Sequence, residues 1–192
     1  MKLLLYGVAL QWRLDVRSRS LLITCYVVPL LFFAVMGSIF SNIQPTAGDT
    51  LIPSMCVMGV SMGALIGMPP SLSELYGSDI RKLYRANGIP AWLGLAATGL
   101  SALLHLLLMC GIICAAAPLL FDSAIPERLP LFFLSLAFLI VVSLAVGGVL
   151  GLAINTQAKL TMLSQLVFLP SIMLSGILFP AELLPDFLRG LG

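Results

Sequence analysis

Hydrophobic residues run along most of this chain in long stretches that short polar segments separate. A helix rises 1.5 Å per residue, so about 20 apolar residues cross a hydrocarbon core of roughly 30 Å. Five stretches without Asp, Glu, Lys or Arg reach this length: Ser20–Gly48, Thr50–Ser73, Ala86–Phe121, Leu129–Ala158 and Leu160–Ala181. The pattern therefore predicts an all-α integral membrane protein with five membrane-spanning helices. The predicted spans are residues 21–40, 51–68, 92–120, 129–154 and 160–180.

Composition supports the same class of protein. Hydrophobic residues make up 60% of the chain, charged residues only 9%, and the mean hydropathy is +1.10. Such values exclude a water-soluble globular domain. Five spans and their connections use nearly all of the 192 residues. We therefore expect one transmembrane domain over residues 1–192, with no separate catalytic or nucleotide-binding domain.

The distribution of basic residues predicts the orientation of the chain in the membrane. Segments before the first span and after the second and fourth spans share one side and carry eight Lys and Arg residues: Lys2, Arg13, Arg17, Arg19, Arg81, Lys82, Arg85 and Lys159. The opposite side carries only two, Arg128 and Arg189. Because basic residues in short loops favour the cytoplasmic side, the N-terminus is expected inside, in the plasma or inner membrane of the cell.

Residues 1–20 are expected to form a helix at the cytoplasmic membrane surface. Its bases, at Arg13, Arg17 and Arg19, would lie near anionic lipid head groups. A cleaved signal peptide is the competing interpretation, but no small-residue cleavage site ends the first apolar run. Periodicity does not distinguish helix from strand here, because apolar residues alternate along the segment: Leu10, Trp12, Leu14 and Val16.

Glycines at a four-residue spacing mark two of the predicted spans. Gly59, Gly63 and Gly67 share one face of the second span, and Gly147 and Gly151 repeat the spacing in the fourth. Residues without side chains allow two helix backbones to approach closely. The face is expected to form a helix contact within the chain; a subunit interface or a sliding surface is the alternative.

The most polar connection is residues 71–90, after Pro69 and Pro70, which are expected to end the second span. Ser78 or Asp79 can cap a short helix that Asn87 and Gly88 would close. Apolar residues recur at helical spacing within it: Ile80, Leu83 and Tyr84. The segment is predicted to be an amphipathic cytoplasmic helix that either rests on lipid or docks a protein.

His105 is the only ionisable residue inside a predicted span. Such a residue is a functional candidate, although a Ser or a carbonyl on a nearby helix can also satisfy a neutral His. Ser101 lies one helical turn before it, which raises the alternative of an intramembrane hydrolase. That chemistry also needs backbone donors for an oxyanion, and no sequence feature supplies them.

Other catalytic and cofactor signatures do not occur in the sequence. There is no phosphate-binding loop, no dinucleotide-binding glycine pattern and no His-Glu-x-x-His motif. All four cysteines lie inside predicted spans, so neither a disulfide nor a metal site is expected, even at Cys110 and Cys114. We expect no cofactor, no nucleic-acid partner and no ATP hydrolysis on this chain.

Two segments carry a resemblance to the membrane permease subunit of ABC transporters of the ABC-2 type. The cytoplasmic segment, which begins at Glu74-Leu-Tyr-Gly77, is similar to the family's coupling helix, which meets the ATPase. The resemblance implies coupling roles for Glu74, Gly77, Ile80, Leu83 and Tyr84. The outer segment, residues 174–188, resembles the family's Leu-Ser-Gly, Phe-Pro and Leu-Pro pattern. Its matching positions are Ser175, Gly176, Phe179, Pro180 and Pro185.

The resemblance implies a permease dimer, with an identical or homologous second copy, that works with separate ATPase subunits holding ATP and magnesium. It also implies a sixth span. This sequence is expected to lack that span, because it ends at Gly192 in the outer segment 181–192. The few polar groups within the spans favour an amphipathic or hydrophobic cargo, such as a drug, lipid, peptide or glycan. The alternatives are a membrane scaffold or immunity protein that does not transport, and an intramembrane enzyme.

Overall fold

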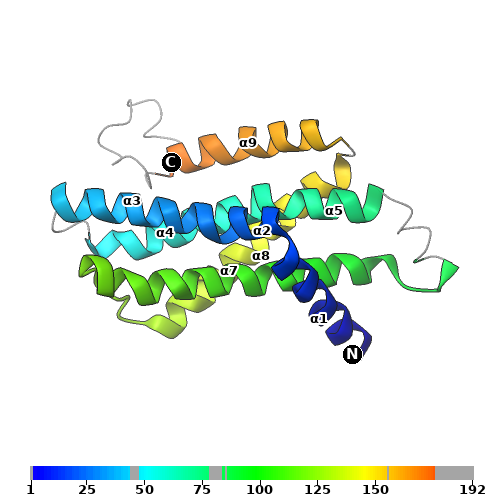
Figure 1. Cartoon of the computed structure of the whole chain (residues 1–192), viewed down its shortest axis with the longest axis horizontal. Coiled ribbons are helices and arrows are strands. Elements are labelled where there is room, and N and C mark those ends of the chain that lie inside the picture. The colour runs from blue at the N-terminus through cyan, green and yellow to red at the C-terminus, as the bar shows by residue number, and fades with distance from the viewer. Residues whose placement is uncertain (1, 44–47, 78–83, 85, 155, 176–192) are drawn as a thin grey trace.

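The computed structural model of the chain describes residues 2–43, 48–77, 84, 86–154 and 156–175, and every regular element within them is a helix. Figure 1 shows long helices lying alongside one another, with α1 (Lys2–Arg17) crossing them at an angle. The all-α fold predicted from the hydrophobic pattern is therefore confirmed.

Residues 2–17 form one helix, so the strand-like alternation in this segment did not indicate a strand. Ser18 separates α1 from α2 (Arg19–Leu22) and has extended backbone angles. Its hydroxyl accepts a hydrogen bond from the Leu21 N–H, as is typical of an N-cap. The chain changes direction at this cap and continues into the first long apolar helix.

Two long helices each contain a π-helical turn directly before proline. In the first, α2 leads through η1 (Ile23–Val27) into α3 (Val28–Ile43). In the second, α4 (Gly48–Met62) leads through η3 (Gly63–Gly67) into α5 (Met68–Gly77).

The prediction that Pro69 and Pro70 end the second span is wrong, because the helix continues through both. In an α-helix a proline ring clashes with the carbonyl four residues earlier. Those carbonyls belong to Leu65 and Ile66, inside the wider turn η3. The same relation holds in the first helix, where Pro29 follows η1. The π-turns therefore give both proline sites the room that an α-helical turn lacks.

The third and fourth long helices are α7 (Ala91–Phe121) and α8 (Leu129–Ala153). With 31 residues, α7 is about 46 Å long, more than a hydrocarbon core requires. The helix runs unbroken through Gly111. It ends at Asp122, which takes the left-handed conformation that Asp tolerates better than most residues.

Within the described residues, four helices are long and apolar enough to cross a membrane: Arg19–Ile39, Thr50–Tyr76, Trp92–Phe121 and Leu129–Ala153. They correspond to the first four predicted spans. The fifth predicted span begins in α9 (Gln157–Leu174), which also contains Lys159 and Gln165. Residues 176–180 of that span lie outside the described part of the chain. A count of five spans therefore stays a prediction.

The helix from Thr50 to Tyr76 lies at the centre of the bundle and is the most buried of the four. It packs against α3, α7 and α8, and the core between them is almost entirely apolar. Large residues at its centre include Ile52, Met55, Leu106, Met109, Ile113 and Ile140. Such a core holds the helices in a fixed arrangement and leaves polar contacts at a few places only.

Candidate functional site

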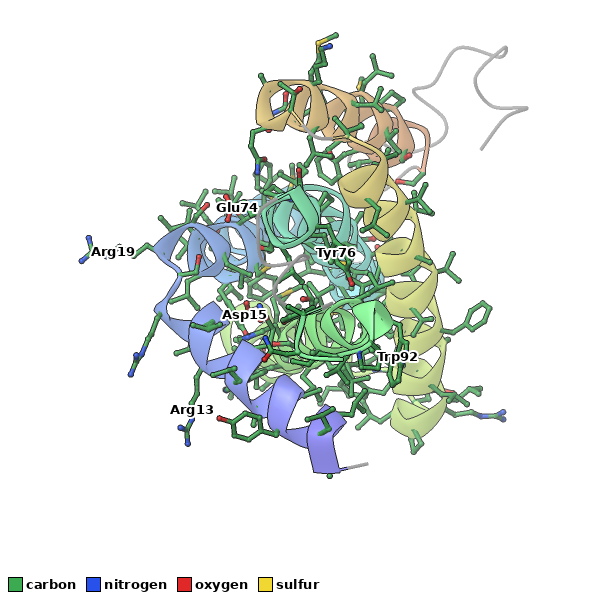
Figure 2. All side chains as sticks on the ribbon, turned by 90° about the vertical axis from the view of Figure 1, so that its right-hand side faces the viewer. Arg13, Asp15, Arg19, Glu74, Tyr76 and Trp92 are labelled. Carbon is green, nitrogen blue, oxygen red and sulfur yellow. The ribbon has the colours of Figure 1, made fainter. Side chains whose placement is uncertain are left out.

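One of these polar contacts is made by Asp15, which α1 carries against α7. The residue is 5% exposed. Gln11, one turn earlier on the same helix face, donates from Nε2 to Asp15 Oδ1 at 2.8 Å. The Ser101 hydroxyl of α7 donates to Oδ2 at 2.5 Å. Figure 2 shows Asp15 directed into the bundle, whereas Arg13 and Arg19 extend away from it.

His105, one turn beyond Ser101 on α7, completes the cluster and is 2% exposed. The Trp12 ring of α1 stacks on the imidazole, with the ring centroids 3.9 Å apart and the planes 6° from parallel. The Tyr26 hydroxyl lies 2.6 Å from Nδ1. His105 Nε2 lies 3.9 Å from Asp15 Oδ2 and has no hydrogen-bond partner among the described residues. The cluster thus joins α1, η1 and α7.

The sequence singled out His105, but its neighbours differ from those expected. We expected a Ser or a carbonyl to satisfy the ring, and Tyr26 from η1 does so. Asp15 was not predicted as a site residue, because it lies outside the predicted spans, among the bases of residues 1–20. The available signal was that Asp15 is the only acidic residue in that basic segment.

The geometry does not support the hydrolase alternative. A serine nucleophile has to hydrogen-bond the base that takes its proton. Ser101 donates to Asp15 instead, and His105 pairs with Tyr26. Ser101 is therefore a structural donor to a buried carboxylate.

A cleft of about 410 Å³ opens beside the cluster, between α1, α5 and α7. Its polar lining residues are Gln11, Asp15, Ser18, Ser71, Glu74 and Thr98. Deeper in the bundle, a hole of about 10 Å³ shares Asp15, Ser71 and Thr98 with the cleft, and His105 lines it as well. That volume is the size of one water molecule. Cleft and hole thus share polar lining residues, beside the apolar residues that also line both.

The predicted coupling residues that the structure describes lie at the same end of the molecule as this cleft. Glu74 is exposed on α5, and Gly77 is the last residue of that helix. Tyr84 is half-buried, and its backbone carbonyl accepts from the Ile89 N–H at 2.9 Å. Ile80 and Leu83 lie outside the described residues. Gly88, between Tyr84 and Ile89, has a φ of +65°, which suits glycine at the end of a helical turn.

Both the end of α5 and Tyr84 pack on the start of α7. The Leu95 N–H donates to the Tyr76 hydroxyl at 3.0 Å. A methyl group at Gly94 would lie 3.0 Å from the Leu75 Cδ2 atom and 3.2 Å from the Tyr84 ring. The absence of a side chain at Gly94 therefore allows this close approach.

The three glycines of the second span face two different helices. A methyl group at Gly59 would overlap Met109 of α7, and one at Gly63 would overlap Leu106. At Gly67 it would lie 3.1 Å from the sulfur of Cys25 in η1. The stripe is therefore covered within the chain by α7 and η1.

The glycines of α8 meet the second span on another face. A methyl group at Gly147 would overlap the carbonyl oxygen of Ala64, and one at Gly151 would lie 2.8 Å from that of Pro69. Backbone thus meets backbone here, as close glycine contacts allow. The two glycine sets therefore do not face each other: those of the second span face α7 and η1, whereas those of α8 pack on another side of the second span.

Of the five matching positions in the predicted outer segment, only Ser175 falls within the described part of the chain. Ser175 ends α9, and its hydroxyl donates to the Ile172 carbonyl at 2.8 Å. The other four positions lie outside the described residues: Gly176, Phe179, Pro180 and Pro185.

A family model described as ABC-2 type transporter matches residues 3–191, nearly the whole chain. No curated protein and no solved structure matches it. The matched region contains α1, the four long apolar helices and α9, so that one family description covers all the elements described above.

Proposed function

Since this chain belongs to the ABC-2 type transporter family, we propose that it is the permease subunit of an exporter driven by a separate ATPase. It is a multi-pass membrane protein and is not itself the ATPase. The energy for transport would enter as ATP and magnesium bound to the partner. Two permease copies, identical or homologous, would enclose the path for an amphipathic or hydrophobic cargo.

The positions of Glu74, Gly77 and Tyr84 support a coupling role for the segment that contains them. Glu74 and Gly77 extend the buried second span beyond its apolar part, and Tyr84 packs back on the start of α7. A push on this segment would therefore act directly on two long helices. ATP-driven closure of the partner would shift them between inward-open and outward-open arrangements.

An apolar cargo path is supported by the surface between α7 and α8. A groove of about 340 Å³ lies there, and its lining includes Leu95, Gly99, Leu144 and Gly148. Almost no polar groups line it, so an ion would lose its hydration without compensation. A drug, a lipid, a peptide or a glycan with an apolar part remains the better cargo.

The test is purification from the native membrane in mild detergent, followed by identification of co-purifying proteins and an assay of magnesium-ATP hydrolysis. We expect a stoichiometric ATPase. The double variant Gly77→Pro with Leu83→Asp should insert normally but lose the ATPase from the purified complex. Glu127→Gln, at the opposite end of the bundle, is the control and should retain it.

Two results would contradict this proposal. The first is a chain that purifies alone from membranes in which transport is active. The second is a coupling double variant that keeps its ATPase and its full hydrolysis rate. A scaffold that does not transport would bind a partner through residues 71–90 but tolerate changes at Phe179 and Pro180. An exporter should lose transport when these outer positions are altered.

A further inference from the structure

The cleft between α1, α5 and α7 has the dimensions of a small-molecule site. Its volume of about 410 Å³ lies within the range of roughly 300–1,000 Å³ that such pockets occupy. Leu14, Leu21 and Leu75 provide apolar walls beside the polar lining. A site with both kinds of wall suits a ligand that has an apolar chain and a polar head.

The charge of the cleft selects the sign of that head. Asp15 and Glu74 both line it, and none of its described lining residues is Lys or Arg. Of the bases in α1 and α2, Arg13 and Arg19 point away from the bundle (Figure 2). Two carboxylates at a partly enclosed, low-dielectric surface attract cations.

At the inner end of the cleft, buried polar atoms of Asp15 and His105 have fewer hydrogen-bond partners than they can accommodate. Asp15 accepts one bond at each oxygen, although a carboxylate has about four acceptor positions. Buried carboxylates are normally paired with a cation, and no Lys or Arg pairs with Asp15 among the described residues. His105 Nε2, buried and without a hydrogen-bond partner there, lines the water-sized hole behind Asp15.

We propose that this cleft binds a cationic amphiphile through a primary ammonium group placed between Asp15 and Glu74. The head has three N–H donors for the two carboxylates that line the cleft, and the chain can lie along Leu14, Leu21 and Leu75. A metal ion fits less well, because the apolar walls at Leu14, Leu21 and Leu75 supply no oxygen ligands. The inference rests on the proposed function, since it names a class of cargo or co-transported lipid for the permease.

The experiment measures binding of decylammonium to the purified chain in nanodiscs, corrected for partition into protein-free nanodiscs. Decyl sulfate and decyl maltoside serve as anionic and neutral probes of equal chain length. Decylammonium should bind at least about tenfold more tightly than either. Asp15→Asn and Glu74→Gln should each weaken its binding by about tenfold. Glu127→Gln, an equivalent change at the other end of the bundle, should leave it unchanged.

Nanodiscs with and without phosphatidylethanolamine separate the two sources of an ammonium head. If phosphatidylethanolamine competes with decylammonium, the occupant is a lipid head group. If it does not compete, the occupant is a free amine. Equal binding of all three probes would overturn the proposal, as would unchanged decylammonium binding by Glu74→Gln. Glu74 is exposed, so this test holds even where Asp15→Asn fails to fold. The binding assay contains no ATPase. Its result therefore does not depend on whether the proposed ATPase partner of the permease is found.

Discussion

Gly147 leaves very little room for a side chain on α8. Since a methyl group there would overlap the backbone oxygen of Ala64, no side-chain rotation can relieve the clash. Gly147→Ala should lower the free energy of unfolding by about 2 kcal/mol or more, as overpacking does. Gly111→Ala is the matched control, because nothing lies within 4 Å of its added methyl group. It should be neutral or stabilise by up to about 1 kcal/mol. Thermal unfolding in detergent compares them, and equal melting temperatures would contradict the assigned contact.

Two buried serines allow the polar cluster to be tested at the level of single hydroxyl groups. Ser101 donates to Asp15, whereas the Ser164 hydroxyl of α9 has no partner among the described residues. Ser101→Ala should therefore destabilise the protein by about 1–3 kcal/mol, because a buried carboxylate loses a donor. Ser164→Ala should change stability by less than about 0.5 kcal/mol or raise it. The same unfolding assay distinguishes them, and the reverse order would show that the Asp15 contact contributes little.

At the scale of elements, the attachment of α1 depends on few side chains. Trp12 stacks on His105, while Tyr6 on the same helix is 69% exposed. Trp12→Ala should therefore free α1 and raise amide hydrogen exchange over residues 2–17 by about tenfold, since an aromatic contact contributes about 1 kcal/mol beyond its buried area. Tyr6→Ala should leave exchange unchanged. Equal protection in both variants would mean that the helix is held elsewhere, for example by Asp15.

The sequence predicted the long helices better than their details, for physical reasons. Hydrophobic length alone identifies a membrane span, so α7 and α8 begin and end within a few residues of the expected bounds. The effect of Pro69 and Pro70 was mispredicted, because the π-turn that accommodates them is a property of backbone hydrogen bonds. Asp15 was missed for a different reason. Its role depends on α1 crossing α7, and no local pattern encodes that contact.

On the scale of the whole molecule, contacts gather the predicted basic segments at one end. Ser18 and Leu21 line the same cleft as Ser71 and Glu74. The α8–α9 connection reaches the same place, since Ser73 donates to the Ile154 carbonyl at 3.0 Å. The far end joins α3 to α7, where Gly37 meets Phe121. Successive connections between the long helices therefore alternate between the two ends of the bundle. In Figure 1 the end of α5 and the start of α7 lie on the right. The loop-by-loop charge count and the packing of the helices therefore divide the chain in the same way.

This division predicts which ends face the cytoplasm. Glu74 lies at the end with the basic segments, and Glu127 follows α7 at the other end; both are exposed. The four native cysteines are buried, so single cysteines at these positions can be labelled selectively. In intact cells, a membrane-impermeant maleimide should label Glu127→Cys but label Glu74→Cys only after permeabilisation. The opposite pattern would contradict a cytoplasmic N-terminus. Labelling of both from outside would contradict the alternation itself, because an odd number of spans separates the two positions.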